Sequence, residues 1–137
     1  MSTFILEIIT PDRIAFTDEV EMVTVPSANG ILGILPNHVP LFTNLVQGEV
    51  KITKGSEETF LAIGDGFLEV SAKKVSILVS SAFHAHEINE REVMDAKKRA
   101  EEALLKKPTG SELTDAQALF RKSIIGLKVL RRKKARN

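Results

Sequence analysis

Two of the three histidines lie close enough in the sequence to share a ligand. His84 and His86 are separated by one residue, so on an extended segment both side chains would leave the same face and could contact one metal ion. A structural zinc site needs four ligands, and no third or fourth ligand is evident near this pair. We therefore expect no metal here and interpret the pair as part of a solvated junction.

The other polar residues also lack a catalytic pattern. The chain contains no GxxxxGK[ST] loop, no HExxH helix and no GxSxG elbow. His38 lies between Pro36 and Pro40, where its ring is expected to order a loop by hydrogen bonding. Asp65 lies between glycines in a predicted turn. We therefore expect no active site, no catalytic residue and no cofactor.

The composition excludes several classes of function. The formal net charge of +1 predicts no bulk attraction to nucleic acid or to an anionic membrane. The absence of cysteine excludes disulfides and thiol chemistry. Residues 1–5 carry neither a basic region nor a long apolar run, so we expect no signal peptide. No segment approaches the roughly 20 apolar residues that span a bilayer, which predicts a soluble protein.

Residues 1–86 are predicted to form an antiparallel β-sandwich. Turn residues recur about every 8 to 12 positions between short apolar runs. Several runs alternate apolar and polar side chains, which indicates sheets with one buried face. The predicted strands are residues 4–10, 20–25, 31–35, 41–46, 49–53, 59–63, 67–71 and 75–79.

Residues 26–40 contain the strongest turn signals of this part. Asn29-Gly30 predicts a hairpin, because both residues tolerate the positive φ of a tight primed turn. The apolar residues that follow, from Ile31 to Leu35, cannot all point inward in a strand whose side chains alternate between faces. We therefore expect at least one of them to face solvent or a partner.

Residues 87–137 are predicted to form an antiparallel helical hairpin. Asn89 is the predicted N-cap of a first helix that ends near Lys107. Thr114 is the predicted N-cap of a second helix that continues to about Arg132. The short link between the helices favours antiparallel packing.

The second helix carries more apolar surface than one packed stripe requires. The facing side of the first helix is mostly alanine, so part of this surface would need the sandwich or a second protein to cover it. Gly126, in the middle of the helix, costs about 1 kcal/mol relative to alanine. We infer that the hairpin has a docked and an undocked arrangement.

Basic residues concentrate at the end of the second helix. They either complement the helix dipole, at a few tenths to about 1 kcal/mol each, or recognise an acidic partner. These residues are Lys128, Arg131, Arg132, Lys133, Lys134 and Arg136.

Three stretches of the sequence together carry a family resemblance. They are VPSANGILGILPNHVPLF at residues 25–42, which contains the pattern GxxGxxPxHxPL, GDGFLEV at residues 64–70, and DAKKRAEEAL at residues 95–104. Over essentially the whole chain, the sequence closely resembles the epsilon subunit of the bacterial and chloroplast F-type ATP synthase.

The resemblance implies a non-catalytic subunit of the central stalk, which couples the catalytic head to the membrane ring of c subunits in ATP synthesis driven by a proton gradient. The sandwich would bind the gamma subunit and sit on the c-ring, with Ile31, Leu35, Asn37 and His38 on that side. The family often has glutamate where Ile31 stands, so the carboxylate for an ionic contact with the ring is missing. The protein would lie at the cytoplasmic face of a bacterial plasma membrane, or at the stromal face of a thylakoid, as part of the complex.

In this family the hairpin moves between a compact state and an extended state that inhibits ATP hydrolysis. The resemblance implies the same regulation here. Lys122, Lys128, Arg131 and Arg132 are the candidates for meeting an acidic loop of the catalytic beta subunit. Such exposed ion pairs are individually weak and sensitive to salt, so only a cluster would contribute much.

Some members of the family bind ATP in the folded hairpin through an (I/L)DxxRA motif. The matching stretch begins at Ile88, but Asn89 replaces the aspartate and Glu92 replaces the arginine, and a glutamate would repel phosphate. Arg121 is the remaining contribution from the second helix. We predict weak or absent ATP binding.

A second interpretation is a free-standing β-sandwich interaction module whose basic tail binds nucleic acid or anionic lipid. The low net charge and the absence of Trp and Tyr favour a protein partner instead. Binding of the isolated protein to heparin that is lost with salt and with removal of the tail would support the module.

Overall fold

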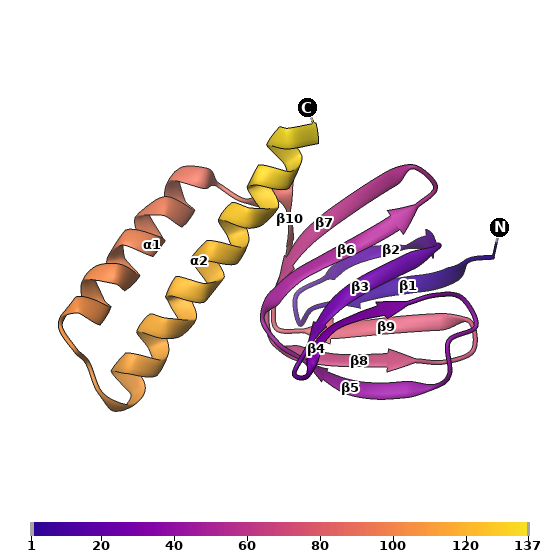
Figure 1. Ribbon diagram of the computed structural model, residues 1–137, viewed down its shortest axis with the longest axis horizontal. Helices are drawn as coiled ribbons and strands as arrows, with labels where there is room; N and C mark the ends of the chain where they lie inside the picture. Colours follow the sequence, from indigo (N-terminus) through magenta and orange to yellow (C-terminus); the bar gives the residue numbers. More distant parts are fainter. Residues whose placement is uncertain (1, 137) are drawn as a thin grey trace. The chain divides into compact units, whose positions relative to one another are not determined.

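The computed structural model describes residues 2–136, with side chains described for residues 2–132. The chain forms two compact units, which divide between His84 and Ala85, two residues before the predicted boundary. Within the described residues the first unit contains ten strands, and the second contains a short 3₁₀ helix and two α-helices (Figure 1). The predicted fold class, a β-sandwich followed by a two-helix hairpin, is confirmed.

The strands of the first unit form one continuous sheet that folds over on itself. The strand order is β10-β7-β6-β3-β5-β8-β9-β1-β2, with β4 paired to β3. The strands are β1 (Phe4–Ile9), β2 (Ile14–Val20), β3 (Met22–Ser27), β4 (Gly30–Ile34), β5 (Leu41–Leu45), β6 (Gly48–Lys54), β7 (Glu57–Ile63), β8 (Gly66–Val70), β9 (Lys74–Val79) and β10 (Ala82–His84).

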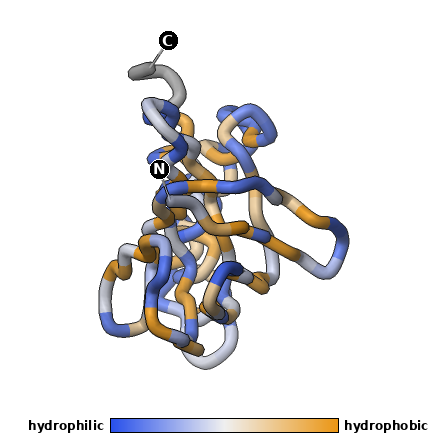
Figure 2. The backbone as a smooth tube through the Cα atoms, turned by 90° about the vertical axis from the view of Figure 1, so that its right-hand side faces the viewer, coloured by the Kyte–Doolittle hydropathy of each residue, from blue (hydrophilic) through white to orange (hydrophobic). Residues whose placement is uncertain are grey.

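The core of the sandwich comes from alternate residues of the longer strands. β6 buries Val50 and Ile52, and β9 buries Val75, Ile77 and Val79, while the residues between them lie nearer the surface. Figure 2 shows this alternation as short bands of hydrophobic and hydrophilic colour along the strands. All members of the core cluster lie within residues 4–82, so the sandwich has a core of its own.

Two strands at the edges of the sheet do not follow the sequence pattern. β2 and β10 are absent from the predicted strands, and most residues of β2 are exposed, so its sequence shows no clean alternation. Backbone pairing with β1 holds β2 in an extended conformation, whatever its pattern of apolar and polar residues.

A side-chain contact also joins β2 to β6. Lys54 Nζ donates a hydrogen bond of 2.9 Å to Asp18 Oδ2 of β2. This bond lowers the pKa of Asp18 and raises the pKa of Lys54.

One strand pair differs from the antiparallel arrangement that the sequence predicts. β1 and β9 pair in parallel, with partners from Ile5 and Lys74 to Ile9 and Leu78. A parallel pair cannot be joined by a tight hairpin and needs a long connection. The strands from β2 to β8 supply that connection. β1 therefore takes its place in the sheet between β2 and β9, the last long strand.

The hairpin between β3 and β4 forms where predicted, but with a different turn. Ser27 is the register partner of Gly30, so Ala28 and Asn29 form the loop. Gly30 has a φ of 120°, whereas Asn29 is not among the residues with positive φ. The Asn29 N–H donates to Ser27 Oγ at 3.3 Å. The prediction that Asn29 and Gly30 are the two central residues of a primed turn was therefore wrong by one residue. Gly30 pairs with Ser27 as the first residue of β4, and the loop consists of Ala28 and Asn29.

The first helix of the second unit begins as predicted. The side-chain Oδ1 of Asn89 accepts a hydrogen bond of 3.2 Å from the N–H of Glu92, which caps α1 (Glu90–Leu105). The helix ends before Lys107, whose φ is 51°, and Pro108 follows. A left-handed residue followed by proline is a typical helix stop.

The second helix begins earlier than predicted. α2 (Gly110–Arg136) starts four residues before Thr114 and extends four residues beyond Arg132. The Thr114 hydroxyl donates back to the Gly110 carbonyl at 3.2 Å, so it lies inside the first turns and does not cap the helix. The expected N-cap at Thr114 was therefore wrong.

The two helices lie side by side and antiparallel, as predicted (Figure 1). Their seam contains small residues, because Ala100 and Ala116 are buried there. Gly126 is also buried, and a Cβ at this position would lie 3.5 Å from Val93 Cγ1. Neither helix, within the described residues, has a run that is long and apolar enough to cross a bilayer.

The tightest backbone approach in the sandwich gives a stability prediction. A Cβ added at Gly66 of β8 would overlap the Leu78 carbonyl and lie 2.7 Å from Val79 Cα of β9. Gly66→Ala should therefore destabilise the protein by roughly 1–3 kcal/mol, because backbone must move to admit the methyl group. Gly33→Ala is the matched control in β4, where the Cβ meets only the flexible end of Met22. Urea unfolding of both variants measures the difference, and equal midpoints would contradict the prediction.

Candidate partner-binding surfaces

β4 and the loop that follows it present apolar side chains to solvent. Ile31 is 77% exposed and Leu35 is 56% exposed, whereas Ile34 is buried in the core. This confirms that residues 31–35 cannot all point inward. Pro36 and Asn37 form a turn directly after Leu35, and Asn37 adopts a φ of 63°.

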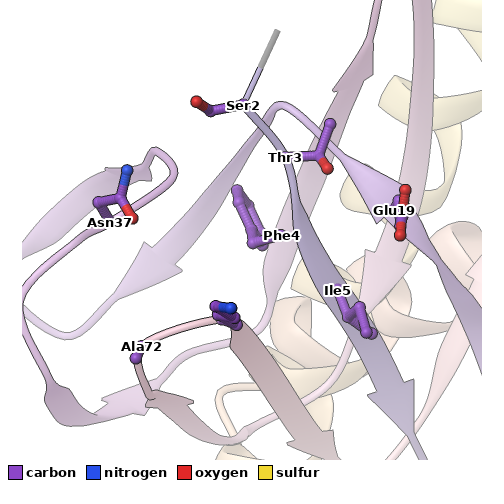
Figure 3. A pocket seen from close by; sticks show the side chains of 8 residues that line it. Ser2, Thr3, Phe4, Ile5, Glu19, Asn37 and Ala72 are labelled. Atoms are coloured by element: carbon purple, nitrogen blue, oxygen red, sulfur yellow. The ribbon is translucent and has the colours of Figure 1, made fainter.

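Asn37 and His38 hold the loop in a defined conformation. The Nδ1 atom of His38 lies 2.8 Å from the Val39 carbonyl oxygen, and because a carbonyl only accepts, Nδ1 is the donor. His38 is thus a loop-ordering residue, as its position between prolines predicted. Asn37 borders an open hollow of about 340 Å³ (Figure 3). The other lining residues are Ser2, Thr3, Phe4, Ile5, Glu19, Ala72 and Lys73.

A second apolar surface crosses the outward side of four neighbouring strands. Phe42 of β5 and Phe67 of β8 stack with ring centroids 5.5 Å apart. Phe67 is the register partner of Leu78 on β9, and Leu78 is the partner of Ile9 on β1. Phe67, Leu78 and Ile9 therefore lie directly across from one another, and Phe42 lies two residues from Asn44, the partner of Phe67 on β5. We call Phe42, Phe67, Leu78 and Ile9 the apolar row. Its first three members are 63%, 48% and 44% exposed.

The apolar row is only partly visible in the sequence pattern. Phe67-Leu68 and Leu78-Val79 are adjacent apolar pairs, and in each pair one residue is buried while its neighbour points outward. A pair of this kind is a visible signal of an apolar outer face. The strand register, which brings the outward residues of four strands next to one another, is not visible in the sequence.

The basic candidates on α2 fall into one group and two outliers. At 100° per residue, Arg121, Lys128 and Arg132 lie within about 40° of one another on the helix surface. Arg131 and Lys122 lie about 80–100° to either side of this face. All five side chains are exposed. The candidates Lys133, Lys134 and Arg136 lie outside the residues whose side chains are described.

The residues of the degenerate ATP motif are used for folding or lie on the surface. Asn89 caps α1 through Glu92, as described above, and Ile88 lies 3.8 Å from the position of a Cβ on Gly126. Arg121 is exposed on α2. The hairpin has an open hollow of about 500 Å³, and none of Ile88, Asn89, Glu92 and Arg121 lines it. Its lining comes from Arg99, Ala100, Ala103, Lys106, Pro108, Glu112, Asp115, Ala116 and Leu119.

The two neighbouring histidines occupy different elements. His84 ends β10, and its Nε2 atom lies 3.0 Å from the Ala15 carbonyl oxygen. His86 lies in the 3₁₀ helix η1 (Ala85–Glu87). Across the described part of the chain, no group of three or more histidine or acidic side chains is arranged to hold a metal ion.

Comparison with known proteins identifies close relatives of this sequence. A family model described as "ATP synthase, Delta/Epsilon chain, beta-sandwich domain" matches residues 3–85. The ATP synthase epsilon chain of Dehalococcoides mccartyi is 38% identical over 135 residues, which cover 98% of this chain and 96% of the relative. The epsilon chain of Herpetosiphon aurantiacus is 37% identical over 131 residues, and that of Koribacter versatilis is 45% identical over 102 residues. These alignments cover 96% and 74% of this chain, and 96% and 72% of the relatives.

Solved structures share the fold at lower identity. A chain in the Euglena gracilis mitochondrial ATP synthase, in a structure of its OSCP/F1/c-ring, superposes with a TM-score of 0.71 at 20% identity. The match covers 98% of this chain and 81% of that one. A chain in the central stalk and c-ring of the Tetrahymena thermophila mitochondrial ATP synthase gives a TM-score of 0.62 at 17% identity, with coverages of 94% and 97%.

The replaced residues of the ATP motif give a binding prediction. Adding ATP at about 1 mM should shift the melting temperature by less than about 1 °C, because a ligand stabilises only when its concentration exceeds its dissociation constant. Thermal unfolding with and without ATP measures the shift. The triple variant Asn89→Asp, Glu92→Arg and Val93→Ala restores the motif and serves as the comparison. A shift of several degrees in the unaltered protein would contradict the prediction.

Proposed function

The chain belongs to the ATP synthase epsilon family, whose members are non-catalytic subunits of the complex, and from that premise we propose that it is a rotor subunit with two tasks. It couples the catalytic head to the membrane c-ring, and it regulates ATP hydrolysis through its helical hairpin. The observation that carries the proposal is the match to the D. mccartyi epsilon chain. That match spans 98% of this chain and therefore includes the hairpin as well as the sandwich.

The apolar row is our proposed docking surface for the gamma subunit. Its stacked Phe42 and Phe67 provide aromatic groups on a rigid sheet, which lose little conformational freedom when a partner covers them. Burial of apolar area contributes about 25 cal/mol per Å² and, unlike an ion pair, is not screened by salt. A rotor subunit that is turned against a load needs this type of attachment more than it needs surface ion pairs.

β4 and the loop that follows it are our proposed contact with the c-ring side. Exposed Ile31 and Leu35 provide an apolar contact, and Asn37 and His38 hold the loop in shape. Isoleucine at position 31 makes this contact apolar where a glutamate would make it ionic. The protein would then be peripheral, at the cytoplasmic face of a bacterial membrane or the stromal face of a thylakoid, attached through the complex.

The basic face of α2 is our proposed contact with the catalytic head. Arg121, Lys128 and Arg132 share one side of the helix and would meet an acidic loop of the beta subunit, with Lys122 and Arg131 at the margins. Each exposed pair contributes about 0.2–1 kcal/mol, so several must act together. Because salt screens exposed charges, the inhibition of ATP hydrolysis should weaken as the ionic strength rises.

Truncation separates the two proposed tasks. The sandwich has its own core, so a chain that ends at Glu87 is expected to fold. Added to a catalytic complex that lacks this subunit, the full chain should inhibit ATP hydrolysis, and the truncated chain should bind without inhibiting. Hydrolysis rates and co-purification measure the two effects. If both chains bind and neither inhibits, the regulatory task is refuted, and if neither binds, the whole proposal is refuted.

Charge on the apolar row tests the gamma surface. Phe42→Glu with Phe67→Glu should weaken binding to a gamma subunit by about 100-fold or more, because two carboxylates would be buried against apolar groups. The sandwich should remain folded, since both side chains already face solvent. Leu105→Glu is the matched control, because Leu105 is an exposed apolar residue at the end of α1 and lies outside the sandwich. Equal binding by the double variant and the control would show that gamma docks elsewhere.

A further inference from the structure

The two units follow each other directly in the chain. β10 ends at His84, and the second unit begins at Ala85 with η1. On the hairpin side, the N–H of Ile88 donates to the Ala85 carbonyl at 3.2 Å, and η1 packs on α2. The chain is therefore held by its own unit on both sides of the peptide bond between residues 84 and 85.

On the sandwich side, β10 is fastened by side chains as well as by its pairing with β7. Arg13 Nη2 donates a hydrogen bond of 2.7 Å to the Ala82 carbonyl, and its guanidinium lies 6.0 Å from the centre of the Phe83 ring. His84 Nε2 donates to the Ala15 carbonyl at 3.0 Å. Each residue of the short strand is thus contacted from the β1–β2 turn or from β2.

Arg13 itself is held in place by the turn that carries it. The Thr10 N–H donates to the Arg13 carbonyl at 2.9 Å. The Arg13 N–H lies 3.2 Å from Thr10 Oγ1, which accepts its hydrogen bond. The donor that fastens β10 is therefore fixed to the end of β1.

We propose that β10 detaches reversibly from β7 and thereby lets the hairpin move further, and we call this strand the latch. Arg13 and His84 are positioning residues that hold the latch closed. This inference rests on the proposed function, which requires the hairpin to change its position. While residues 85–87 stay folded against α2, the hairpin can change its position only about the backbone dihedrals near the bond between residues 84 and 85. Release of the three residues of β10 from β7 would add about 10 Å of linker, at about 3.3 Å per residue.

β10 is the element suited to opening. It has three residues, pairs with one strand only and lies at the end of the sheet order. Local opening in proteins draws on segments with few backbone partners and little buried surface. A strand in the middle of the sheet, such as β8 between β5 and β9, has partners on both sides and would stay closed.

An engineered disulfide tests the latch. Ala62 and Phe83 are register partners on β7 and β10. Partners of this kind have Cα atoms about 4.5–5.5 Å apart, which a disulfide can bridge. Because the chain has no cysteine, Ala62→Cys with Phe83→Cys would form one bond only. In a catalytic complex that lacks this subunit, the reduced variant should inhibit ATP hydrolysis as the unaltered chain does, and the oxidised variant should bind but inhibit about tenfold less.

A second cysteine pair controls for the presence of a disulfide. Thr53 and Glu58 are register partners on β6 and β7, away from β10. Thr53→Cys with Glu58→Cys should inhibit equally in both redox states. Equal inhibition by the oxidised and reduced β10 pair would overturn the latch and leave the proposed function standing. Absence of inhibition by the unaltered chain would overturn the proposed function, and the latch with it.

Hydrogen exchange of the full chain tests the role of Arg13 without an activity assay. Arg13→Ala should speed exchange of the peptide that covers β10 by about tenfold or more, while β8 and β9 stay protected. Arg13→Lys, which keeps a charged donor, should recover part of the protection. Lys51→Ala, which removes the ion pair with Glu58 on the sheet surface, is the matched control. Unchanged exchange of β10 in Arg13→Ala would overturn the assignment of Arg13.

Discussion

The pleat of a β-strand sends successive side chains to opposite faces, so a sheet folded over on itself can bury only about half of its residues. In this protein several strands carry apolar residues on both faces. The inner ones, such as Leu68 and Ile77, form the core, and the outer ones remain at the surface. The exposed loop after β4 and the apolar row both follow from this constraint. The proposed partner surfaces therefore arise from the same strands that hold the sandwich together.

The fold class was predictable because its strongest signals are local. Alternation marked most strands, and the change of period after residue 87 marked the hairpin, with Asn89 capping α1 as expected. The errors have a common cause in backbone hydrogen bonding that ignores side-chain type. β2 and β10 are strands because β1 and β7 pair with them, although their own sequences alternate poorly. Likewise Thr114 resembles a cap, but its hydroxyl has a carbonyl acceptor within the helix.

The candidate sites were predictable in part, and the limit is set by register. Ile31 and Leu35 follow from counting residues along one strand, which needs no knowledge of neighbours. The row from Phe42 to Ile9 requires the pairing of four strands, and these pairings join residues that are far apart in the chain. The fastening of β10 by Arg13 depends on the same long-range geometry. A sequence pattern shows which side chains of one strand share a face. Only the pairing of the strands shows which of these side chains lie next to one another across the sheet.

The parallel pairing of β1 with β9 also sets the order in which the molecule can be completed during synthesis. β1 leaves the ribosome well before its partner residues on β9, from Lys74 to Leu78. Until then Leu6 and Ile8 cannot be enclosed on the β9 side, so the nascent chain carries apolar surface that chaperones can recognise. The helical hairpin follows the sandwich in the chain and closes through neighbouring residues. The sandwich can therefore be completed only shortly before the hairpin emerges.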